Sequence, residues 1–225
     1  MGLHFKILYL LIVIAFISCN SSQKGSNYSK LQVRKIVKDS VIVDCHYTLD
    51  EAMAGSKAPK NILQQLQLVD VKYYSTDGKI HKGQILTNKK LVNKIEILFH
   101  FILQNKFPIA QAIPIVKYNW DDNLSMQANN TYSFCYRDIS YSKHAWGMAI
   151  DINPDFNPLR WKVGYENRLN KPVGASYNPK VPGTFYSLQP VVEEFRKLGF
   201  RWGHNFKIKC DDHHFEIEYS CKNIS

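Results

Sequence analysis

The sequence is poor in several features that would define its class. It has only five cysteines in 225 residues, and none has the CxxC spacing of a thiolate zinc site. It has no internal repeat and no low-complexity block, so a repeat architecture or a largely disordered chain is not expected. It also has no RNP, helix-turn-helix or zinc-finger motif, which argues against nucleic acid as a partner.

The N-terminus lacks an apolar run long enough to cross a bilayer as a helix. The run Ile7–Ile17 has about eleven residues, whereas a transmembrane helix needs roughly 20. With Lys6 ahead of it, the run predicts a secretory signal peptide over residues 1–18. The segment FISC, which ends at Cys19, resembles a bacterial lipobox, with Phe in place of the usual Leu. The resemblance implies a lipid on Cys19.

An ordinary secretory signal with an incidental cysteine, or an uncleaved anchor, remains an alternative. The polar stretch 20–30 favours cleavage, because its composition is that of a tether between a lipid anchor and a domain. We therefore predict a signal over 1–18, a tether over 19–40 and one domain over 41–225. We expect the protein in a bacterial cell envelope, attached to the membrane on its periplasmic or extracellular face.

Acidic residues are scarce relative to basic ones, with 19 Asp and Glu against 29 Lys and Arg. A basic exported protein is attracted to anionic envelope polymers and lipid head groups. The export signal is a second argument against a nucleic-acid partner. Many of the lysines would simply keep the surface solvated. The sequence carries no signal for an oligomeric state.

Four cysteines remain besides the one in the lipobox: Cys45, Cys135, Cys210 and Cys221. In an exported protein they allow two disulfides in three pairings. We favour a Cys210–Cys221 bridge, because it would close a short loop around the second of the two motifs described below.

Hydrophobic periodicity predicts a mixture of helices and strands. We expect helices over 49–68, broken at Ala58-Pro59, over 89–105, capped by Asn88, and over 188–198, ended by Gly199. We expect strands at 41–43, 113–118, 147–152, 200–202 and 214–219, a hairpin over 69–87 that turns at Asp77-Gly78, and a long loop over 153–184. The 147–152 strand is predicted to be half-buried, with Asp151 on one face. This mixture indicates an α+β fold with a small antiparallel sheet flanked by helices.

Two clusters of metal-ligating residue types stand out. His144 and Asp151 lie in SKHAWGMAIDIN (142–153), and DDHHFE follows at 211–216. His144, Asp151 and His214 form the ligand set of a catalytic zinc site, which takes three protein ligands and leaves a position for water. Each cluster alone is common by chance. The two in this order, in an exported protein, favour a metal site.

The neighbouring polar residues are expected to support that site. Asp211 is the candidate base, with Asp212 as its competitor, and Glu216 shares the strand face of His214 and would orient its imidazole. On a regular strand His213 would point away from the metal. His100 lies beside an apolar helical stripe and is expected to be structural.

A further candidate is Arg137, which precedes the first cluster. A guanidinium is able to hold a scissile carbonyl and the negative charge that grows on its oxygen. Taken alone, however, a single arginine is more often a surface or salt-bridge residue.

The two clusters resemble the motifs of the M15 peptidases, which include D-alanyl-D-alanine carboxypeptidases and L,D-endopeptidases. The family pattern SxHxxGxAxD followed by [DE]xxH is matched by Ser142, His144, Gly147, Ala149, Asp151, Asp211 and His214. The similarity is greatest to L-alanyl-D-glutamate endopeptidases. It spans most of residues 49–218, with supporting stretches at 77–84, 88–90, 106–109, 122–126 and 129–131.

The resemblance implies zinc held by His144, Asp151 and His214. It also implies Asp211 as the catalytic carboxylate, Arg137 as the substrate or oxyanion contact, and the fold of the hedgehog signalling domains. Ser142 and Trp202 are expected to lie beside the ligands or the substrate. The family often has WGGxW before the second motif, but this chain has WGHNF at 202–206. His204 is therefore expected to alter the wall of the cleft, and with it the substrate preference.

These features predict a zinc-dependent peptidase that hydrolyses peptidoglycan stem peptides, with the L-Ala–D-Glu endopeptidase as the first choice. The close alternative is a D-alanyl-D-alanine carboxypeptidase. A non-catalytic, metal-stabilised module that binds the cell envelope is an alternative of another class. Asp211 argues against that module, because a pure binder has no need of a base.

Overall fold

The structure, a computed structural model, describes residues 41–138 and 141–217. All of them belong to one compact unit, residues 40–225. The predicted signal, the lipobox cysteine, the whole of the tether and Cys221 lie outside the described residues. Within the described ranges, no helix has both the length and the apolar character needed to cross a membrane.

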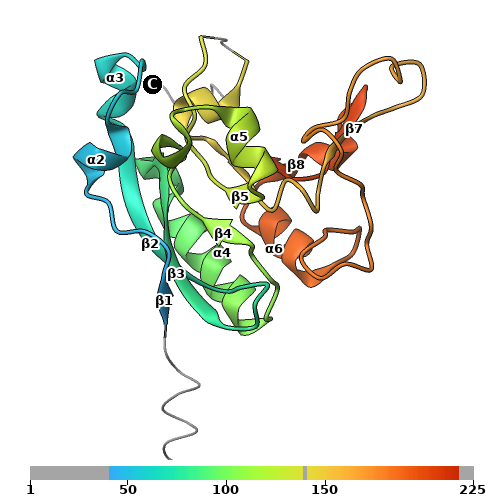
Figure 1. Cartoon of the computed structure of the whole chain (residues 1–225), viewed down its shortest axis with the longest axis horizontal. Coiled ribbons are helices and arrows are strands. Elements are labelled where there is room, and N and C mark those ends of the chain that lie inside the picture. The colour runs from blue at the N-terminus through green and yellow to red at the C-terminus, as the bar shows by residue number, and fades with distance from the viewer. Residues whose placement is uncertain (1–40, 139–140, 218–225) are drawn as a thin grey trace, which may run out of the picture. The chain divides into compact units, whose positions relative to one another are not determined.

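A long antiparallel hairpin forms the first layer (Figure 1). Strands β2 (Leu66–Tyr74) and β3 (Ile80–Asn88) pair along their full length, and β1 (Ile42–Val43) joins β3 in parallel. The turn between them contains Gly78 at a φ of +79°, which residues with a side chain rarely adopt. The predicted hairpin and first strand are therefore confirmed.

Two single-turn helices precede the hairpin, where one broken helix was predicted. Helix α2 (Leu49–Met53) begins at Thr48, which forms a capping box with Glu51. Helix α3 (Lys60–Leu63) follows Pro59, which disfavours a helical conformation for the residue before it. The predicted helix extended to residue 68, and this is wrong, because its last residues form the start of β2.

The predicted helix over 89–105 is confirmed as a short 3-10 turn, η1 (Lys89–Leu91), followed by α4 (Val92–Gln104). The side chain of Asn88 caps the turn by accepting a hydrogen bond from the Lys90 N–H at 3.1 Å. Helix α4 packs against β2 and buries one stripe: Ile95, Leu98, Phe99 and Ile102. His100 is exposed on this helix and does not belong to the buried stripe.

A second, three-stranded antiparallel sheet has the order β6 (Ala149–Asp151), β10 (His214–Glu216), β8 (Arg201–Trp202). Its register places His214 opposite Asp151. Helix α6 (Pro190–Lys197) packs beside β8 and ends before Gly199, at a φ of +85°. The prediction of a half-buried strand over 147–152 is wrong in part, because all three residues of β6 are buried.

Short elements make up the rest of the described fold. They are β4 (Gln111–Ala112), η2 (Ile115–Tyr118), α5 (Asp122–Gln127), β5 (Asn130–Thr131), η3 (Lys143–Trp146), β7 (Leu159–Trp161), η4 (Gly203–Asn205) and β9 (Lys209–Asp211). β4 pairs with β5 in parallel, and β7 pairs with β9 antiparallel. The predicted loop over 153–184 therefore contains one short strand, β7.

The predicted strand over 113–118 is wrong, because residues 115–118 form the 3-10 turn η2. Pro114 precedes the turn at a φ of −54°, a value that its ring allows, and Asn119 ends the turn at a φ of +52°. The observed mixture of small sheets and few helices is consistent with the predicted α+β class. The relation to hedgehog domains stays a prediction.

Candidate metal centre

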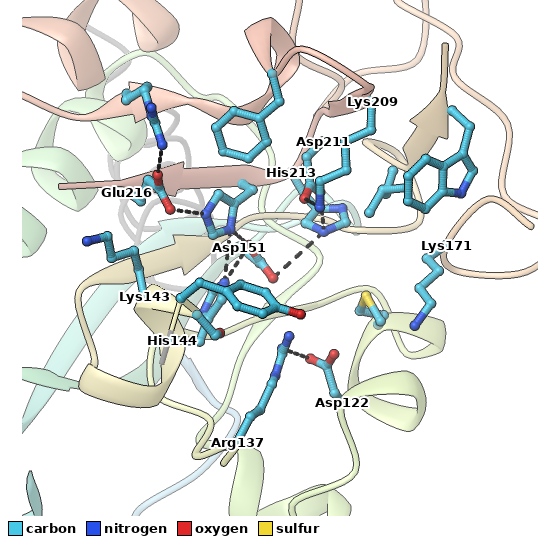
Figure 2. A pocket seen from close by; sticks show the side chains of 18 residues that line it. Asp122, Arg137, Lys143, His144, Asp151, Lys171, Lys209, Asp211, His213 and Glu216 are labelled. Carbon is cyan, nitrogen blue, oxygen red and sulfur yellow. Dashed lines mark hydrogen bonds and ion pairs between the residues drawn. The ribbon is translucent and has the colours of Figure 1, made fainter. Parts of the chain in front are cut away.

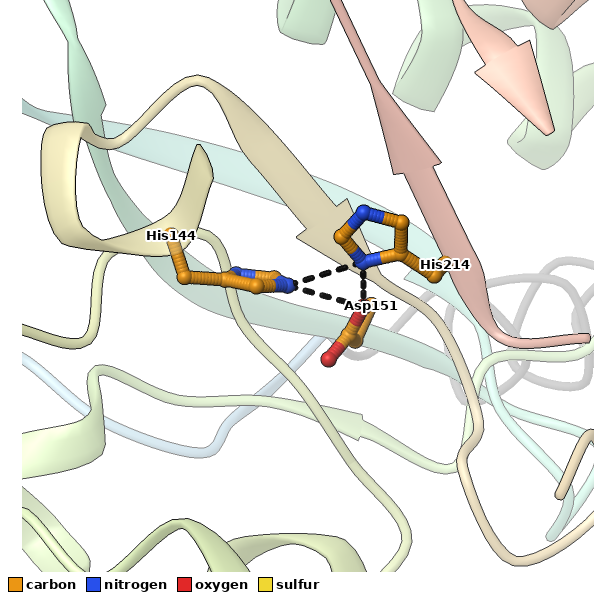
Figure 3. Close-up of side chains that lie close together, drawn as sticks. All are labelled: His144, Asp151 and His214. Carbon is orange, nitrogen blue, oxygen red and sulfur yellow. Dashed lines mark hydrogen bonds and ion pairs between the residues drawn. The ribbon is translucent and has the colours of Figure 1, made fainter. Parts of the chain in front are cut away.

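Three ligand-type side chains from different parts of the chain converge on one point (Figure 3). His144 comes from η3, Asp151 from the end of β6 and His214 from the start of β10. His144 Nε2 lies 3.0 Å from both Asp151 Oδ1 and His214 Nδ1, and these two atoms are 2.9 Å apart. All three side chains are buried.

The local backbone explains why the first two residues meet. Gly147 has a φ of +64° and ends η3, so the chain reverses between His144 and β6. A Cβ at this glycine would lie 2.7 Å from the backbone nitrogen of Asn88, so the position has no room for a side chain. The antiparallel pairing of β6 with β10 then brings His214 to Asp151.

Each imidazole is held in the tautomer that a metal requires. His144 Nδ1 lies 2.7 Å from the carbonyl oxygen of Ser133, which only accepts, so Nδ1 donates and Nε2 keeps its lone pair. His214 Nε2 lies 3.0 Å from Glu216 Oε2, which leaves Nδ1 to face Asp151. Glu216 also pairs with Arg201. Glu216 thus contacts His214 as the strand pattern predicted.

The three atoms fit a zinc ion. In a tetrahedral site with bonds of about 2.0–2.1 Å, neighbouring ligand atoms lie about 3.3 Å apart. The observed spacings of 2.9–3.0 Å form a nearly equilateral triangle of two nitrogens and one carboxylate oxygen. The lone pairs of these ligand atoms face one another at this distance, and they repel each other unless a proton or a cation lies between them.

The electrostatics of these side chains also favour a bound cation. Burial raises the pKa of Asp151, but the neighbouring His144 and His213 outweigh it and hold that pKa well below its usual range. Burial lowers the pKa of His214, but its contacts with Asp151 and Glu216 raise the pKa to about 10. Without a metal, a proton therefore sits on His214, where a cation would replace it.

The predicted base, Asp211, faces the same cavity as the ligands (Figure 2). It is buried, and its Oδ2 lies 2.8 Å from Lys209 Nζ. Burial raises the pKa of Asp211, but His213, His214 and Lys209 together hold it below the usual value. Asp211 is therefore ionised at neutral pH and able to accept a proton.

Its competitor, Asp212, has a different environment. It is fully buried, and its oxygens lie 2.7 Å from Arg160 Nε and 2.6 Å from His204 Nδ1. It does not line the cavity that contains the three ligands. This arrangement favours Asp211 over Asp212 as the proton acceptor.

The prediction that His213 points away from the site is wrong. His213 precedes β10 and lies in a turn, so the alternation of a strand does not apply to it. Its Nε2 lies 3.0 Å from Asp211 Oδ1 and 3.7 Å from Asp151 Oδ2, and its Nδ1 lies 2.7 Å from the carbonyl of Asn157. The sequence does not show whether His213 points toward the site or away from it, because this depends on the residue at which β10 begins.

Arg137 lines the cavity, partly exposed (Figure 2). Its Nη2 lies 2.8 Å from Asp122 Oδ1 and donates to the Tyr132 hydroxyl at 3.2 Å. The same hydroxyl lies 3.0 Å from Asp151 Oδ2, so Tyr132 links the guanidinium to the metal centre. Arg137 Nε is buried and has no hydrogen bond within the described residues.

The remaining predicted residues divide between cavity and core. Ser142 lines the cavity as the residue before η3. Trp202 does not line it, and its indole donates to the Asp212 carbonyl at 2.8 Å while it packs on Phe215. Trp202 thus supports the turn that carries Asp211, and a contact with the substrate stays a prediction. His204 stacks on Trp202 and binds Asp212 instead of forming the cavity wall.

The cavity has a volume of about 500 Å³, which lies within the usual range for small-molecule sites. Apolar side chains also line it, among them Met126, Leu159, Trp161 and Phe206. Cys210 lies next to Asp211 but is joined to neither Cys45 nor Cys135. Its predicted partner, Cys221, is outside the described residues, so that disulfide stays a prediction.

Residues 137–217 match a family model, Peptidase_M15_4, described as D-alanyl-D-alanine carboxypeptidase. The matched segment carries Arg137, all three candidate ligands and Asp211. The match supports a peptidase of the M15 kind, and the L,D-endopeptidase subgroup stays a prediction. Neither the curated proteins nor the solved structures compared with this chain gave a match.

Proposed function

We propose that this protein is a zinc-dependent peptidase that hydrolyses the stem peptides of peptidoglycan. One observation carries the proposal: two imidazoles and a carboxylate converge within 3.0 Å, beside an ionised Asp211 in the same cavity. The match to a peptidase family over residues 137–217 supports the same reaction class.

His144, Asp151 and His214 would hold the zinc. When bound, zinc supplies Lewis-acid polarisation of a carbonyl and makes water more acidic. Asp211 takes the proton from the attacking water and delivers it to the leaving amine. Lys209 Nζ lies 2.8 Å from Asp211 Oδ2, and His213 Nε2 lies 3.0 Å from Asp211 Oδ1.

Arg137 is the proposed contact for the substrate carbonyl and for the charge that develops on it. Its guanidinium is fixed by Asp122 and Tyr132 and stays charged, since neighbouring groups raise its pKa further despite burial. Held in one geometry, it stabilises a growing negative charge with little reorganisation.

The bond we favour is the one between L-Ala and D-Glu, because the supporting stretches outside the two motifs resemble that subgroup. The second candidate is the terminal D-Ala–D-Ala bond. The description of the matching family, D-alanyl-D-alanine carboxypeptidase, favours this second activity. We further propose that a lipid on Cys19 holds the enzyme at the cell envelope.

Mass spectrometry of defined muropeptides tests both activities at once. The zinc-loaded full chain is incubated with a disaccharide pentapeptide, with a chelator-treated sample as control. Loss of the whole peptide after L-Ala identifies the endopeptidase, and loss of a single D-Ala identifies the carboxypeptidase. An intact pentapeptide in the zinc-loaded sample would contradict the proposal.

A further inference from the structure

More basic than acidic side chains line the cavity that contains the candidate metal ligands. Its lining includes five basic side chains, namely Arg137, Lys143, Lys171, Arg201 and Lys209. It includes four carboxylates, namely Asp122, Asp151, Asp211 and Glu216. A divalent cation at the metal centre adds to the positive excess.

Three of these carboxylates have basic partners inside the cavity. Arg137 pairs with Asp122 at 2.8 Å, Lys209 pairs with Asp211 at 2.8 Å, and Arg201 pairs with Glu216. The fourth carboxylate, that of Asp151, faces the histidines. No acidic side chain of the lining is left for the other two bases.

Those two bases are Lys143 and Lys171. Within residues 41–138 and 141–217, neither ammonium group has an ion pair or a side-chain hydrogen bond. Lys143 directly precedes the ligand His144 and is half-buried. Lys171 is exposed, but two backbone hydrogen bonds to Leu159, at 2.7 and 3.0 Å, fix its position.

The two lysines lie on different sides of Asp151 (Figure 2). The apolar side chains of Leu159, Trp161 and Phe206 also line the cavity and make part of it less polar than water. A charge pair is stronger beside such walls than on an open surface. The cavity is thus suited to a ligand with negative charge at two positions.

We propose that Lys143 and Lys171 determine specificity by binding two carboxylates of an extended peptide, one on each side of the metal centre. This inference rests on the proposed function and narrows its substrate to acidic peptides. Stem peptides in which the D-glutamate α-carboxylate and the terminal carboxylate are free fit this site. Forms in which these groups are amidated fit it less well.

Binding to the metal-free protein tests this inference without turnover. The probe is the pentapeptide L-Ala-γ-D-Glu-L-Lys-D-Ala-D-Ala, with two analogues amidated at either the D-glutamate or the C-terminus. Calorimetry compares the wild-type full chain with Lys143→Gln and Lys171→Gln. Lys72→Gln is the matched control, because Lys72 is an exposed lysine on β2 and does not line the cavity.

We expect Lys143→Gln to weaken binding of the free acid about tenfold and Lys171→Gln about threefold, since Lys171 is the more exposed. Each lysine is expected to bind one of the two carboxylates. When that carboxylate is amidated, the variant of this lysine should bind the analogue as tightly as the wild type does. Lys72→Gln should bind as the wild type does.

The inference would be overturned if each variant lost the same affinity for the free acid and for both amidated analogues. It would also be overturned if the wild type showed no detectable binding of the free acid. Hydrolysis by the zinc-loaded protein is scored separately. If the wild type binds the acid through both lysines but cleaves nothing, the proposed function fails and the two carboxylate sites stand. If it cleaves acid and amide peptides equally, the inference fails and the peptidase stands.

Discussion

The hairpin with its helix and the sheet that carries the candidate metal ligands differ in what they bury. Between β2, β3 and α4 the core is almost wholly apolar, with Val71, Ile85 and Leu98 among its members. Around β6 and β10 the chain buries Asp151, Asp211 and His214 together. Buried charges cost free energy even when they are paired. The second region therefore carries a cluster that stability alone does not explain, and this is the mark of a functional site.

The two regions share one apolar core, and the end of the hairpin also contacts the turn that carries His144. The Asn88 N–H donates to the Gly147 carbonyl at 3.0 Å, and the Thr87 hydroxyl donates to the same oxygen at 3.1 Å. The end of the hairpin thus holds the turn that positions His144. The apolar region acts as the support, and the charged region as the site.

The largest expected effect is on turnover. Asp211→Asn should keep the metal and reduce kcat by about 10²–10⁴-fold, because the amide no longer accepts the proton. Metal content and peptide hydrolysis are measured on the same sample. Asp77→Asn, in the exposed hairpin turn, serves as the control. Unchanged hydrolysis by Asp211→Asn would remove this residue from its role and favour the non-catalytic module.

The next effect lies in the apolar region. Leu98→Ala should lower the free energy of unfolding by about 2–5 kcal/mol, because it leaves a cavity where a fully buried side chain packed. Urea denaturation gives this value, and zinc titration of the folded variant should give the wild-type affinity. A large loss of zinc affinity in the folded variant would show that packing in the apolar region also determines metal binding.

The contact between the regions is tested at Gly147. Gly147→Ala should lower the free energy of unfolding by about 2–4 kcal/mol, because a Cβ meets the Asn88 backbone and the φ is positive. Gly164→Ala is the matched control, since its φ is also positive but nothing lies within 4 Å of the added carbon. We expect about 1 kcal/mol there. If urea denaturation gave the same decrease in the free energy of unfolding for both variants, the close approach to the Asn88 backbone would not be the cause.

A smaller effect is expected at the residue that orients a ligand. Glu216→Gln should weaken zinc binding about 10–100-fold, because the carboxylate that fixes the His214 tautomer is lost. Competition with a chromogenic chelator measures the affinity. Glu193→Gln, in the first turn of α6 and outside the cavity lining, provides the control. An unaltered affinity in Glu216→Gln would mean that β10 alone orients the imidazole.

The pH dependence of metal binding follows from the same residue. The pKa of His214 is raised to about 10 in the metal-free protein, so a cation must displace its proton at any lower pH. Zinc affinity should therefore rise about tenfold per pH unit between pH 6 and 8. Chelator competition at several pH values gives the slope. A flat profile would show that His214 is already neutral there.

The elements with strong periodicity and clear caps were predictable from the sequence. The hairpin with Asp77-Gly78 and the helix after Asn88 are examples. The strand predicted over 113–118 failed, since Pro114 and Asn119 impose a turn on apolar residues. For such a short run, periodicity does not distinguish a strand from a turn.

At the site, the two motifs indicated which residues converge, because ligand chemistry restricts the residue types. The side of β10 on which His213 lies was not predictable, because it depends on where pairing begins, one residue later. The location of Trp202 in the core was missed for a similar reason. An indole satisfies its N–H as well on a backbone carbonyl as on a substrate.

The central claim is that His144, Asp151 and His214 share one divalent cation. Anomalous diffraction at the zinc edge, from crystals of protein loaded with one equivalent of zinc, tests it most directly. The account predicts one peak at about 2.0–2.2 Å from His144 Nε2, Asp151 Oδ1 and His214 Nδ1. A zinc peak elsewhere, or one that leaves any of these three atoms without a bond to the ion, would contradict it.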